Sequence, residues 1–269
     1  MSLSQRADFE MDSRTNALVN KSQELVEWTY CANSFWLAIE PGDDAMSPWL
    51  RSDGFWESWV SIWLIRNMPN HKNFIDVGSN IGYFSMLAAK LGANVVSIDP
   101  NTKVLELLRK SISRNGLEQQ IVVITGAVGE KNDVMALDIP LNHSGGGHII
   151  SAKESKNRNV TFVSTIDEIV DRLDLDLDET IIKIDAEGFE FEIIRGSMGA
   201  LIHSPSCVLI IEWDATRFND WETKINWLRK DFDIYLIDGA GEEVLADNQT
   251  LENCGLQMLA LRKSQFIQD

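Results

Sequence analysis

The residues best suited to chemistry lie where apolar runs end, and the first such place is the stretch 73–84. An apolar run there carries Asp76 and passes into a glycine-bearing turn, Gly78–Gly82, which also contains Ser79 and Asn80. A helix-forming run follows the turn. A strand, a glycine turn and a helix N-terminus in this order direct backbone N–H groups outward, so the sequence predicts a ligand site here.

The residue types within the turn indicate which ligand it suits. A dinucleotide fingerprint has the pattern G-x-G-x-x-G, whose second glycine leaves the backbone bare for a pyrophosphate. Asn80 and Tyr83 stand at the second and third glycine positions, and Asp76 adds negative charge. A diphosphate is therefore a poor match, and a ligand with a cationic centre fits better. S-adenosylmethionine is the commonest such cofactor, and we expect a side chain at Gly78 to fill the space it occupies.

Two further apolar runs end in residues that suit a nucleoside. Asp99 follows the glycine turn by roughly 20 residues, where an acid can accept both ribose hydroxyls. The next run ends in Gly126, Ala127 and Val128, which are small enough to admit an adenine face. Ligands in open α/β sheets lie beyond the carboxyl ends of the strands, so these residues are expected to meet the turn at one site.

The fourth and fifth runs end in acids. Asp185 and Glu187 follow the fourth run, and Glu212 ends the fifth. A single acid at a strand end is usually a helix cap, but the joint occurrence in this order predicts a nucleoside-type cofactor. The predicted cofactor-binding residues are Asp76, Gly78, Ser79, Asn80, Gly82, Asp99, Ala127, Val128, Asp185 and Glu187.

The candidates for proton transfer lie in the later part of the chain. Lys183 and Asp185 are two residues apart, so on a strand their side chains share a face. They form either a structural ion pair or a pair that lowers the pKa of an acceptor and takes its proton. Glu212 is a further candidate base, and His148 follows three glycines in a segment able to swing over a site.

Two other roles compete for the same carboxylates. Glu187 could cap the following helix, since acids favour a first turn. Asp185, Glu187 and Glu212 together could hold a divalent cation such as magnesium. No spacing fixes a ligand set, so the sequence predicts no metal.

The alternation of strand-like and helix-like runs predicts the scaffold. It predicts a doubly wound, mostly parallel sheet of seven strands. Two final runs, 233–237 and 256–261, are joined by an acidic segment without helical period, which indicates a closing hairpin with an antiparallel strand. Between residues 129 and 166 the alternation breaks, which predicts a small antiparallel insertion with a flexible tip at Gly145–Gly147.

Residues 1–72 are predicted to form a helical extension, with the cofactor-binding domain at 73–269. The extension holds six of the nine tryptophans, and Phe55, Trp59 and Trp63 recur at helical spacing. Such a stripe most often packs against a core, but some of these rings could instead act as a lid over the substrate.

Composition restricts the partners. The chain has 269 residues, and Lys+Arg 24 against Asp+Glu 41 gives a net charge of −17. An acidic surface repels phosphate backbones and anionic lipid, so we expect neither nucleic acid nor membrane as partner. No apolar run approaches the roughly 18 residues that span a bilayer, and no signal peptide is visible. Three cysteines without metal spacing fit a reducing compartment, so a cytoplasmic location is expected.

The motifs together resemble a known family. The segments 76–82, 165–167 and 182–190, with Asp99, are similar to those of FkbM-type S-adenosylmethionine-dependent methyltransferases. The resemblance covers about Phe74 to Gly199. It implies a Rossmann-like sheet with a terminal antiparallel strand, and methyl transfer to oxygen on a small hydroxylated molecule such as a sugar or secondary metabolite. A nicotinamide-dependent oxidoreductase and a non-catalytic cofactor-binding module are the alternatives.

Overall fold

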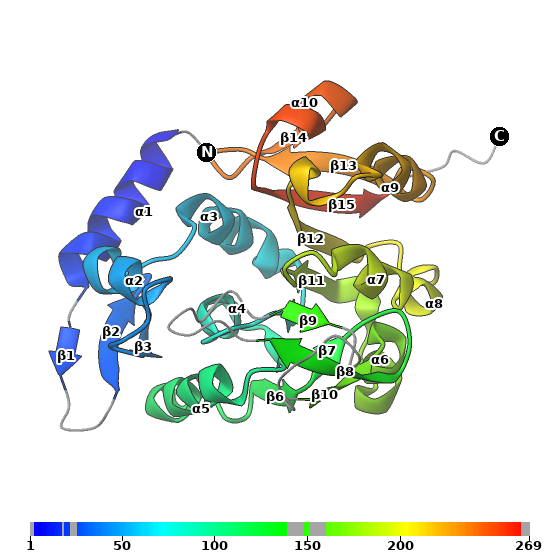
Figure 1. Ribbon diagram of the computed structural model, residues 1–269. Coiled ribbons are helices and arrows are strands. Elements are labelled where there is room, and N and C mark those ends of the chain that lie inside the picture. The colour runs from blue at the N-terminus through cyan, green and yellow to red at the C-terminus, as the bar shows by residue number, and fades with distance from the viewer. Residues whose placement is uncertain (1–2, 18, 22–25, 139–147, 151–159, 265–269) are drawn as a thin grey trace.

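The computed structural model describes residues 3–17, 19–21, 26–138, 148–150 and 160–264 (Figure 1). Its centre is an eight-stranded mixed sheet in the order β14-β13-β15-β12-β11-β4-β5-β6. The strands are β4 (Asn73–Val77), β5 (Asn94–Asp99), β6 (Ile121–Thr125), β11 (Thr180–Ile184), β12 (Val208–Trp213), β13 (Phe232–Ile237), β14 (Glu243–Leu245) and β15 (Gln257–Lys263).

The five strands from β12 to β6 in this order run parallel, and β15 runs antiparallel to both of its neighbours. The closing hairpin predicted from the sequence is therefore present as β13 and β15. The predicted count of seven strands is wrong, because the connection between them adds the edge strand β14 and a short helix, α10 (Asn248–Asn253). Three strand residues are too few to show an alternating pattern in the sequence.

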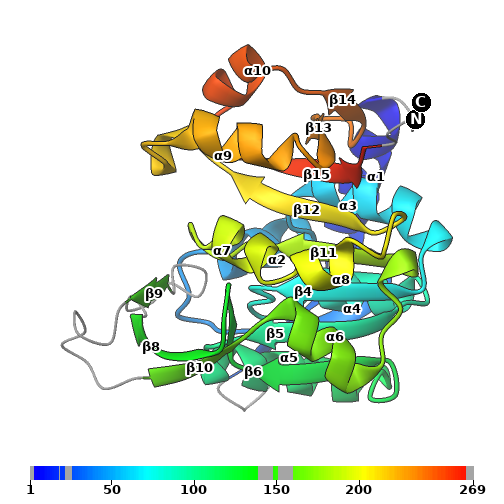
Figure 2. The same ribbon diagram turned by 90° about the vertical axis from the view of Figure 1, so that its right-hand side faces the viewer.

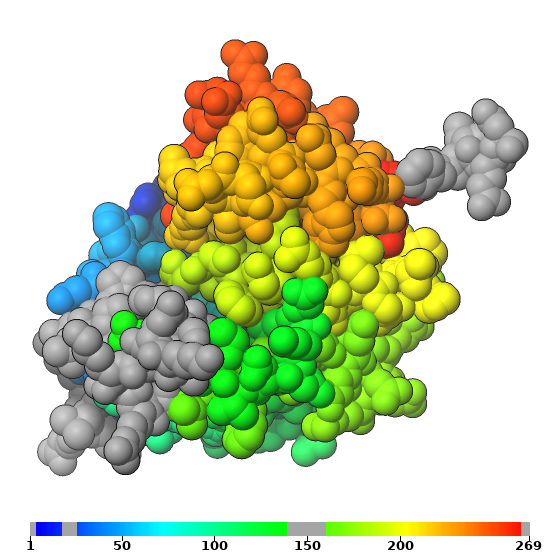
Figure 3. All heavy atoms as spheres, turned by 45° about the vertical axis from the view of Figure 1, so that its right-hand side comes forward, coloured from blue at the N-terminus to red at the C-terminus, as the bar shows by residue number. Residues whose placement is uncertain are grey.

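Helices cover both faces of the sheet, and strand residues alternate between the two layers. Phe74 packs with the layer of α3 (Ser58–Asn67), α4 (Tyr83–Lys90) and α5 (Thr102–Asn115). Its neighbour Ile75 packs with the other layer. Figures 2 and 3 show the second layer, whose helices are α6 (Ile166–Leu173), α7 (Glu190–Arg195), α8 (Met198–Leu201) and α9 (Trp221–Leu228).

The strand order reverses between β4 and β11. The chain leaves β4 towards β5 and β6 on one side, and β11 and β12 extend the sheet on the other side. Val77 and Ile184 are register partners at the carboxyl ends of these two strands. Open α/β sheets bind ligands at such a reversal, because the two connections leave in opposite directions and open a crevice.

The N-terminal region is mixed rather than helical. Between α1 (Leu3–Asn16) and α2 (Ser47–Asp53) lies an antiparallel sheet of three strands. Strands β2 and β3 are five-residue runs with mostly buried side chains, so they lack the alternation that signals a strand. The strands are β1 (Val19–Lys21), β2 (Glu27–Cys31) and β3 (Phe35–Ile39).

The aromatic stripe is shorter than predicted, because α3 begins at Ser58 and Phe55 precedes it. Trp63 is buried in the same core as Phe35 and Tyr83, so the N-terminal region and the sheet share one hydrophobic core. The edge strand β3 is also joined to α5, because the backbone N–H of Ala38 donates a hydrogen bond of 2.9 Å to the side-chain Oγ of Ser111.

The insertion forms a second, four-stranded sheet in the order β7-β10-β8-β9. Strand β8 pairs antiparallel with β9 and β10, while β10 pairs parallel with β7. The predicted tip at Gly145–Gly147 lies outside the described residues. The strands are β7 (Ala127–Val128), β8 (Asp133–Asp138), β9 (His148–Ile150) and β10 (Val160–Ser164). Among the described residues, no helix combines the length and apolarity needed to cross a membrane.

Candidate active site

A cavity of about 340 Å³ opens at the carboxyl ends of the central strands, where the strand order reverses. Its two ends differ in composition. We call one the Asp99 end, which comprises Gly78–Asn80, Asp99 and Gly126–Val128. We call the other the Lys183 end, which comprises Glu57, Lys183, Asp185, Glu212 and Arg217.

Gly78 is required by the protein backbone itself. Its φ is +75°, and a Cβ added there would lie 1.8 Å from the carbonyl oxygen of Asp185. The sequence predicts that a side chain at Gly78 would fill the space of the ligand, but the protein itself excludes such a side chain first. The first obstacle is the loop after β11, which approaches the turn after β4 so closely that only a hydrogen atom fits between them.

Gly82 also faces protein. A Cβ at this position would lie 2.2 Å from Cδ1 of Leu108 on α5, and its φ is +85°. Gly82 does not line the cavity, so its geometry supports close packing of the turn on α5 rather than the predicted contact with a cofactor.

The middle of the turn carries polar atoms without partners. Ser79 Oγ and Asn80 Oδ1 are buried, and neither has a hydrogen-bond partner within the part of the chain that the structure describes. Both residues line the cavity. Buried polar atoms are nearly always paired, so two unpaired atoms on one cavity wall fit a polar ligand that supplies the missing groups.

Asp99 fastens the turn as well as lining the cavity. Its Oδ2 accepts a hydrogen bond of 2.9 Å from the Asn80 N–H, and its Oδ1 accepts one of 2.8 Å from the Asn101 N–H. Burial raises the pKa of Asp99 to about 6, although these two backbone donors lower it. Each carboxylate oxygen has a second lone pair, so the predicted role of accepting ribose hydroxyls is compatible with this geometry. Ala127 and Val128 line the same end, as the adenine prediction requires.

Asp76 lies beneath the cavity rather than in its wall. It is 1 % exposed, and its Oδ2 accepts a hydrogen bond of 2.6 Å from Ser85 Oγ on α4. Its Oδ1 lies 3.8 Å from Nζ of Lys183. Burial raises the pKa of Asp76, and Lys183 lowers it. The geometry therefore favours support of the lysine over the predicted contact with a cofactor.

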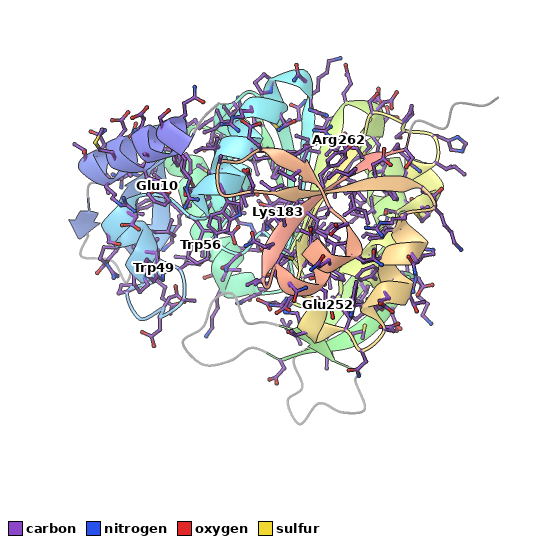
Figure 4. The ribbon with its side chains drawn as sticks, turned by 90° about the horizontal axis from the view of Figure 1, so that it is seen from above. Glu10, Trp49, Trp56, Lys183, Glu252 and Arg262 are labelled. Atoms are coloured by element: carbon purple, nitrogen blue, oxygen red, sulfur yellow. The ribbon has the colours of Figure 1, made fainter. Side chains whose placement is uncertain are left out.

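Lys183 is a fully buried cation at the cavity wall (Figure 4). Its Nζ donates a hydrogen bond of 2.9 Å to Asp185 Oδ2 and lies 5.2 Å from the ring centroid of Phe84. Burial lowers the pKa of Lys183, but the carboxylates of Asp185, Asp76 and Glu57 more than offset this, so its pKa is raised. Lys183 and Asp185 thus form an ion pair that borders the cavity, and a role of this pair in proton transfer stays a prediction.

The loop that carries Asp185 is held by Glu190, a residue that the sequence analysis did not single out. Its Oε1 accepts hydrogen bonds of 3.0 Å from the N–H groups of both Ala186 and Gly188. Glu187, between them, has a positive φ of 52° and lines the cavity. Glu190 therefore holds the loop in front of α7, whose N-cap residue is Phe189 and makes no side-chain capping hydrogen bond, and the capping role of Glu187 stays a prediction.

Glu212 and Glu187 share a cation that sequence reasoning missed. Arg217 forms ion pairs with Glu212 Oε2 and, at 3.3 Å, with Glu187 Oε2. Burial raises the pKa of Glu212 to about 8; Asp185 raises it further and Arg217 lowers it. Arg217 lies in a 3-10 turn just beyond the end of β12, and this nearness to a strand end is the signal by which the sequence could have indicated it. Among the described residues, no group of three or more His, Cys, Asp and Glu side chains is placed to hold a metal.

The N-terminal region supplies a wall of the cavity. Met46, Trp56 and Glu57 line it, and Asn80 Nδ2 lies 3.2 Å from Met46 Sδ. Figure 4 shows Trp56 on the side facing Lys183, whereas Trp49 lies at the outer edge of α2. Nothing in the sequence marked Glu57, because it belongs to no motif. His148 lies on β9, opposite Asp138, and its side chain falls outside the described part of the chain, so its catalytic role stays a prediction.

A family model for the methyltransferase FkbM domain matches residues 76–258, more than half of the chain. The chain therefore belongs to the FkbM methyltransferase domain family. The resemblance inferred from the glycine turn and the segment 182–190 is confirmed. No curated protein matches the chain.

Solved structures with this arrangement are distant in sequence. A methyltransferase FkbM from Methylobacillus flagellatus KT is 20% identical, with a TM-score of 0.45, over 71% of this chain and 44% of that one. A putative SAM-dependent methyltransferase from Streptococcus mutans is 14% identical, with a TM-score of 0.49, over 91% and 57%. An O-methyltransferase from Bacillus cereus in complex with SAH is 12% identical, with a TM-score of 0.43, over 77% and 80%. The chain thus spans less than half of the first protein.

Proposed function

We propose that this protein transfers a methyl group from S-adenosylmethionine to a hydroxyl oxygen of a small molecule. The observation that carries the proposal is the cavity at the strand reversal, with the unpaired atoms of Ser79 and Asn80 at one end and the Lys183–Asp185 ion pair at the other. Membership of a methyltransferase family supports the cofactor class and weighs against the nicotinamide alternative.

The residues of the Asp99 end fit the nucleoside part of this cofactor. Asp99 would accept the ribose hydroxyls, Ser79 and Asn80 would pair with polar groups of the ligand, and Gly126–Val128 would border the adenine. When bound, the cofactor supplies a methyl group on a sulfonium centre that is already activated for transfer.

The Lys183 end would prepare the acceptor. Asp185 would take the proton of the acceptor hydroxyl during methyl transfer, and the neighbouring Lys183 would stabilise the oxygen as negative charge develops. A positioned base of this kind contributes about 10²–10⁴-fold. Alignment of the reacting atoms in a closed site contributes roughly 7–11 kcal/mol in well-oriented systems. Glu212 is the alternative base, since it lies at the same end.

The charge of the cavity disfavours an anionic acceptor. Among the described residues, five carboxylates and two cations line the cavity, and an anionic group would be repelled there. A hydroxylated small molecule without an anionic group, in the cytoplasm, is thus our proposed substrate class. The charged lining residues are Glu57, Asp99, Asp185, Glu187 and Glu212, with Lys183 and Arg217.

Titration calorimetry with S-adenosylhomocysteine, NAD and ATP tests the cofactor assignment. We expect S-adenosylhomocysteine alone to bind tightly. Asp99→Asn should weaken it by about 10- to 100-fold, because charge-assisted hydrogen bonds contribute about 1.5–3 kcal/mol. Unchanged affinity in this variant would remove Asp99 from the site, and preferential binding of NAD would overturn the cofactor class. Binding without any transfer to a panel of hydroxylated compounds would favour a non-catalytic module.

A further inference from the structure

Glu57 is held in an unusual conformation at the wall of the cavity. It immediately precedes α3 with φ 40° and ψ 71°, the left-handed region that non-glycine residues rarely adopt. Such a conformation is strained and persists where the surrounding structure imposes it, most often at functional sites. The residue follows Trp56, and both line the cavity.

The carboxylate of Glu57 receives no hydrogen bond at its buried oxygen. Oε2 is shielded from solvent and has no partner among the described residues. Lys183 is close enough to lower the pKa of Glu57, but its short contact is made with Asp185. Glu10, on α1, provides a contrast, because its carboxylate is paired with Arg6 and Ser58. Since buried carboxylates need a proton or a partner, a ligand in the cavity that Glu57 lines is placed to supply one.

Glu57 lies at the end of the cavity away from the nucleoside. A ligand with its ribose at Asp99 and its adenine at Gly126–Val128 would place its remaining part towards Lys183, near which Glu57 lies. At that end Tyr83 and Phe84, at the start of α4, form the wall together with Glu57. The part of S-adenosylmethionine that reaches this end bears its two cationic groups, the sulfonium and the α-ammonium.

We propose that Glu57 binds the cationic end of the cofactor, as the negatively charged partner of the sulfonium or the α-ammonium group. This inference rests on the proposed function, since it takes S-adenosylmethionine as the ligand. It gives the N-terminal region a direct part in cofactor binding, through one carboxylate on the turn that enters α3. Binding the cation supplies the partner that Oε2 lacks.

Protonation of Glu57 couples this contact to pH. Burial raises the pKa of Glu57 to about 7; Asp185 raises it further and Lys183 lowers it. Asp76 under the cavity and Tyr83 on α4 are the other titratable groups that face this cluster. Only the charged carboxylate attracts a cation, so its contribution to affinity grows as pH rises. The charged fraction increases about tenfold between pH 6 and pH 8 for a pKa of 7.

Calorimetry on the whole protein and on Glu57→Gln tests the proposal with three probes. S-adenosylmethionine carries both cations, S-adenosylhomocysteine only the ammonium, and 5′-methylthioadenosine neither. At pH 8 we expect Glu57→Gln to weaken the first two by about 10- to 100-fold and to leave 5′-methylthioadenosine unchanged. At pH 6, where most of the native Glu57 is already uncharged, the loss of affinity caused by Glu57→Gln should be about tenfold smaller than at pH 8. Equal losses for the first two identify the ammonium as the partner, and a larger loss for S-adenosylmethionine identifies the sulfonium.

Glu10→Gln is the matched control, because Glu10 lies in the same N-terminal region but outside the cavity. It should lower the melting temperature without changing any of the three affinities. If the native protein binds S-adenosylhomocysteine and Glu57→Gln binds both cationic probes equally well, this inference fails while the proposed function stands. If the native protein binds none of the probes, the proposed function fails with it.

A titration of the native protein covers the case in which Glu57→Gln does not fold. The side-chain carboxyl carbons of glutamate can be followed by ¹³C NMR, with Glu57 expected to titrate near pH 7 in the free protein. Saturating S-adenosylmethionine, which carries both cations, should lower that pKa if the ligand brings a cation to the carboxylate. A pKa that stays the same or rises on binding would overturn the proposal.

Discussion

The Asp99 end of the cavity is built mainly from backbone and one carboxylate, whereas the Lys183 end is built from charged side chains. At the Asp99 end, the Asp99 carboxylate accepts hydrogen bonds from the Asn80 N–H in the turn after β4 and from the Asn101 N–H after β5. At the Lys183 end, Lys183 and Arg217 are shared among carboxylates from distant parts of the chain. The first arrangement fixes a shape, and the second fixes a balance of charge.

This difference suits the two tasks that we propose. Recognition of a nucleoside requires donors and acceptors at fixed positions, which a rigid turn provides. Methyl transfer requires groups that can gain or release a proton near neutral pH, and Glu57 and Glu212 have pKa values raised to about 7 and about 8 mainly by burial. Perturbed carboxyl groups concentrate where chemistry is performed.

The largest effect is expected from Gly78→Ala, because the added methyl group would force apart the turn of the Asp99 end and the Asp185 loop of the Lys183 end. The new Cβ would meet the Asp185 carbonyl at 1.8 Å, and the φ of +75° adds strain. Strain of about 1–2 kcal/mol plus overpacking of about 1–3 kcal/mol should lower the free energy of unfolding and abolish binding of S-adenosylhomocysteine. Gly116→Ala is the control, since its φ is +67° with nothing within 4 Å. Equal losses in urea unfolding would show that the approach of the two loops is not tight.

Asp185→Asn should impair methyl transfer, which we assign to the Lys183 end, without impairing cofactor binding, which we assign to the Asp99 end. Loss of the proton acceptor is expected to reduce kcat by about 10²-fold or more, while the Asp99 end still binds S-adenosylhomocysteine. Transfer of tritium from labelled S-adenosylmethionine to acceptors found in a screen of hydroxylated compounds gives the rate.

Asp167→Asn is the control for this experiment, because Asp167 accepts hydrogen bonds from Gly199 and Ala200 away from the cavity. It should affect melting temperature but not transfer. A near-normal kcat in Asp185→Asn would assign the proton to Glu212.

The smallest effect concerns the tryptophans of the N-terminal region. Trp56 lines the cavity, whereas Trp49 is 58 % exposed. Trp56→Ala should raise KM for the acceptor several-fold, because the wall at the Lys183 end is lost. Trp49→Ala should change the free energy of unfolding by no more than about 0.5 kcal/mol and leave KM alone. If both variants behave alike in kinetics and melting, the lid interpretation fails.

Sequence patterns were sufficient where the determinants are local. The turn Gly78–Gly82, Asp99 and Asp185 were identified because each follows an apolar run, and the carboxyl ends of parallel strands meet at one edge of a sheet. The motifs at these strand ends resemble those of the FkbM family, and the family model that matches residues 76–258 confirms the resemblance. The period of the apolar pattern predicted the α/β sheet and its closing hairpin.

The tertiary structure decided which way those residues face and what joins them. Asp76 faces Lys183 and Gly82 faces Leu108, although both belong to the motif that indicated the cofactor. Glu57 and Arg217 reach the cavity from segments without a motif. The edge strand β14 and the three strands of the N-terminal region also escaped prediction, because short or fully buried strands lack alternation. Local sequence therefore determined which strand ends carry chemistry, and only packing between distant segments decided the partners, because burial and charge pairing depend on neighbours that sequence spacing does not encode.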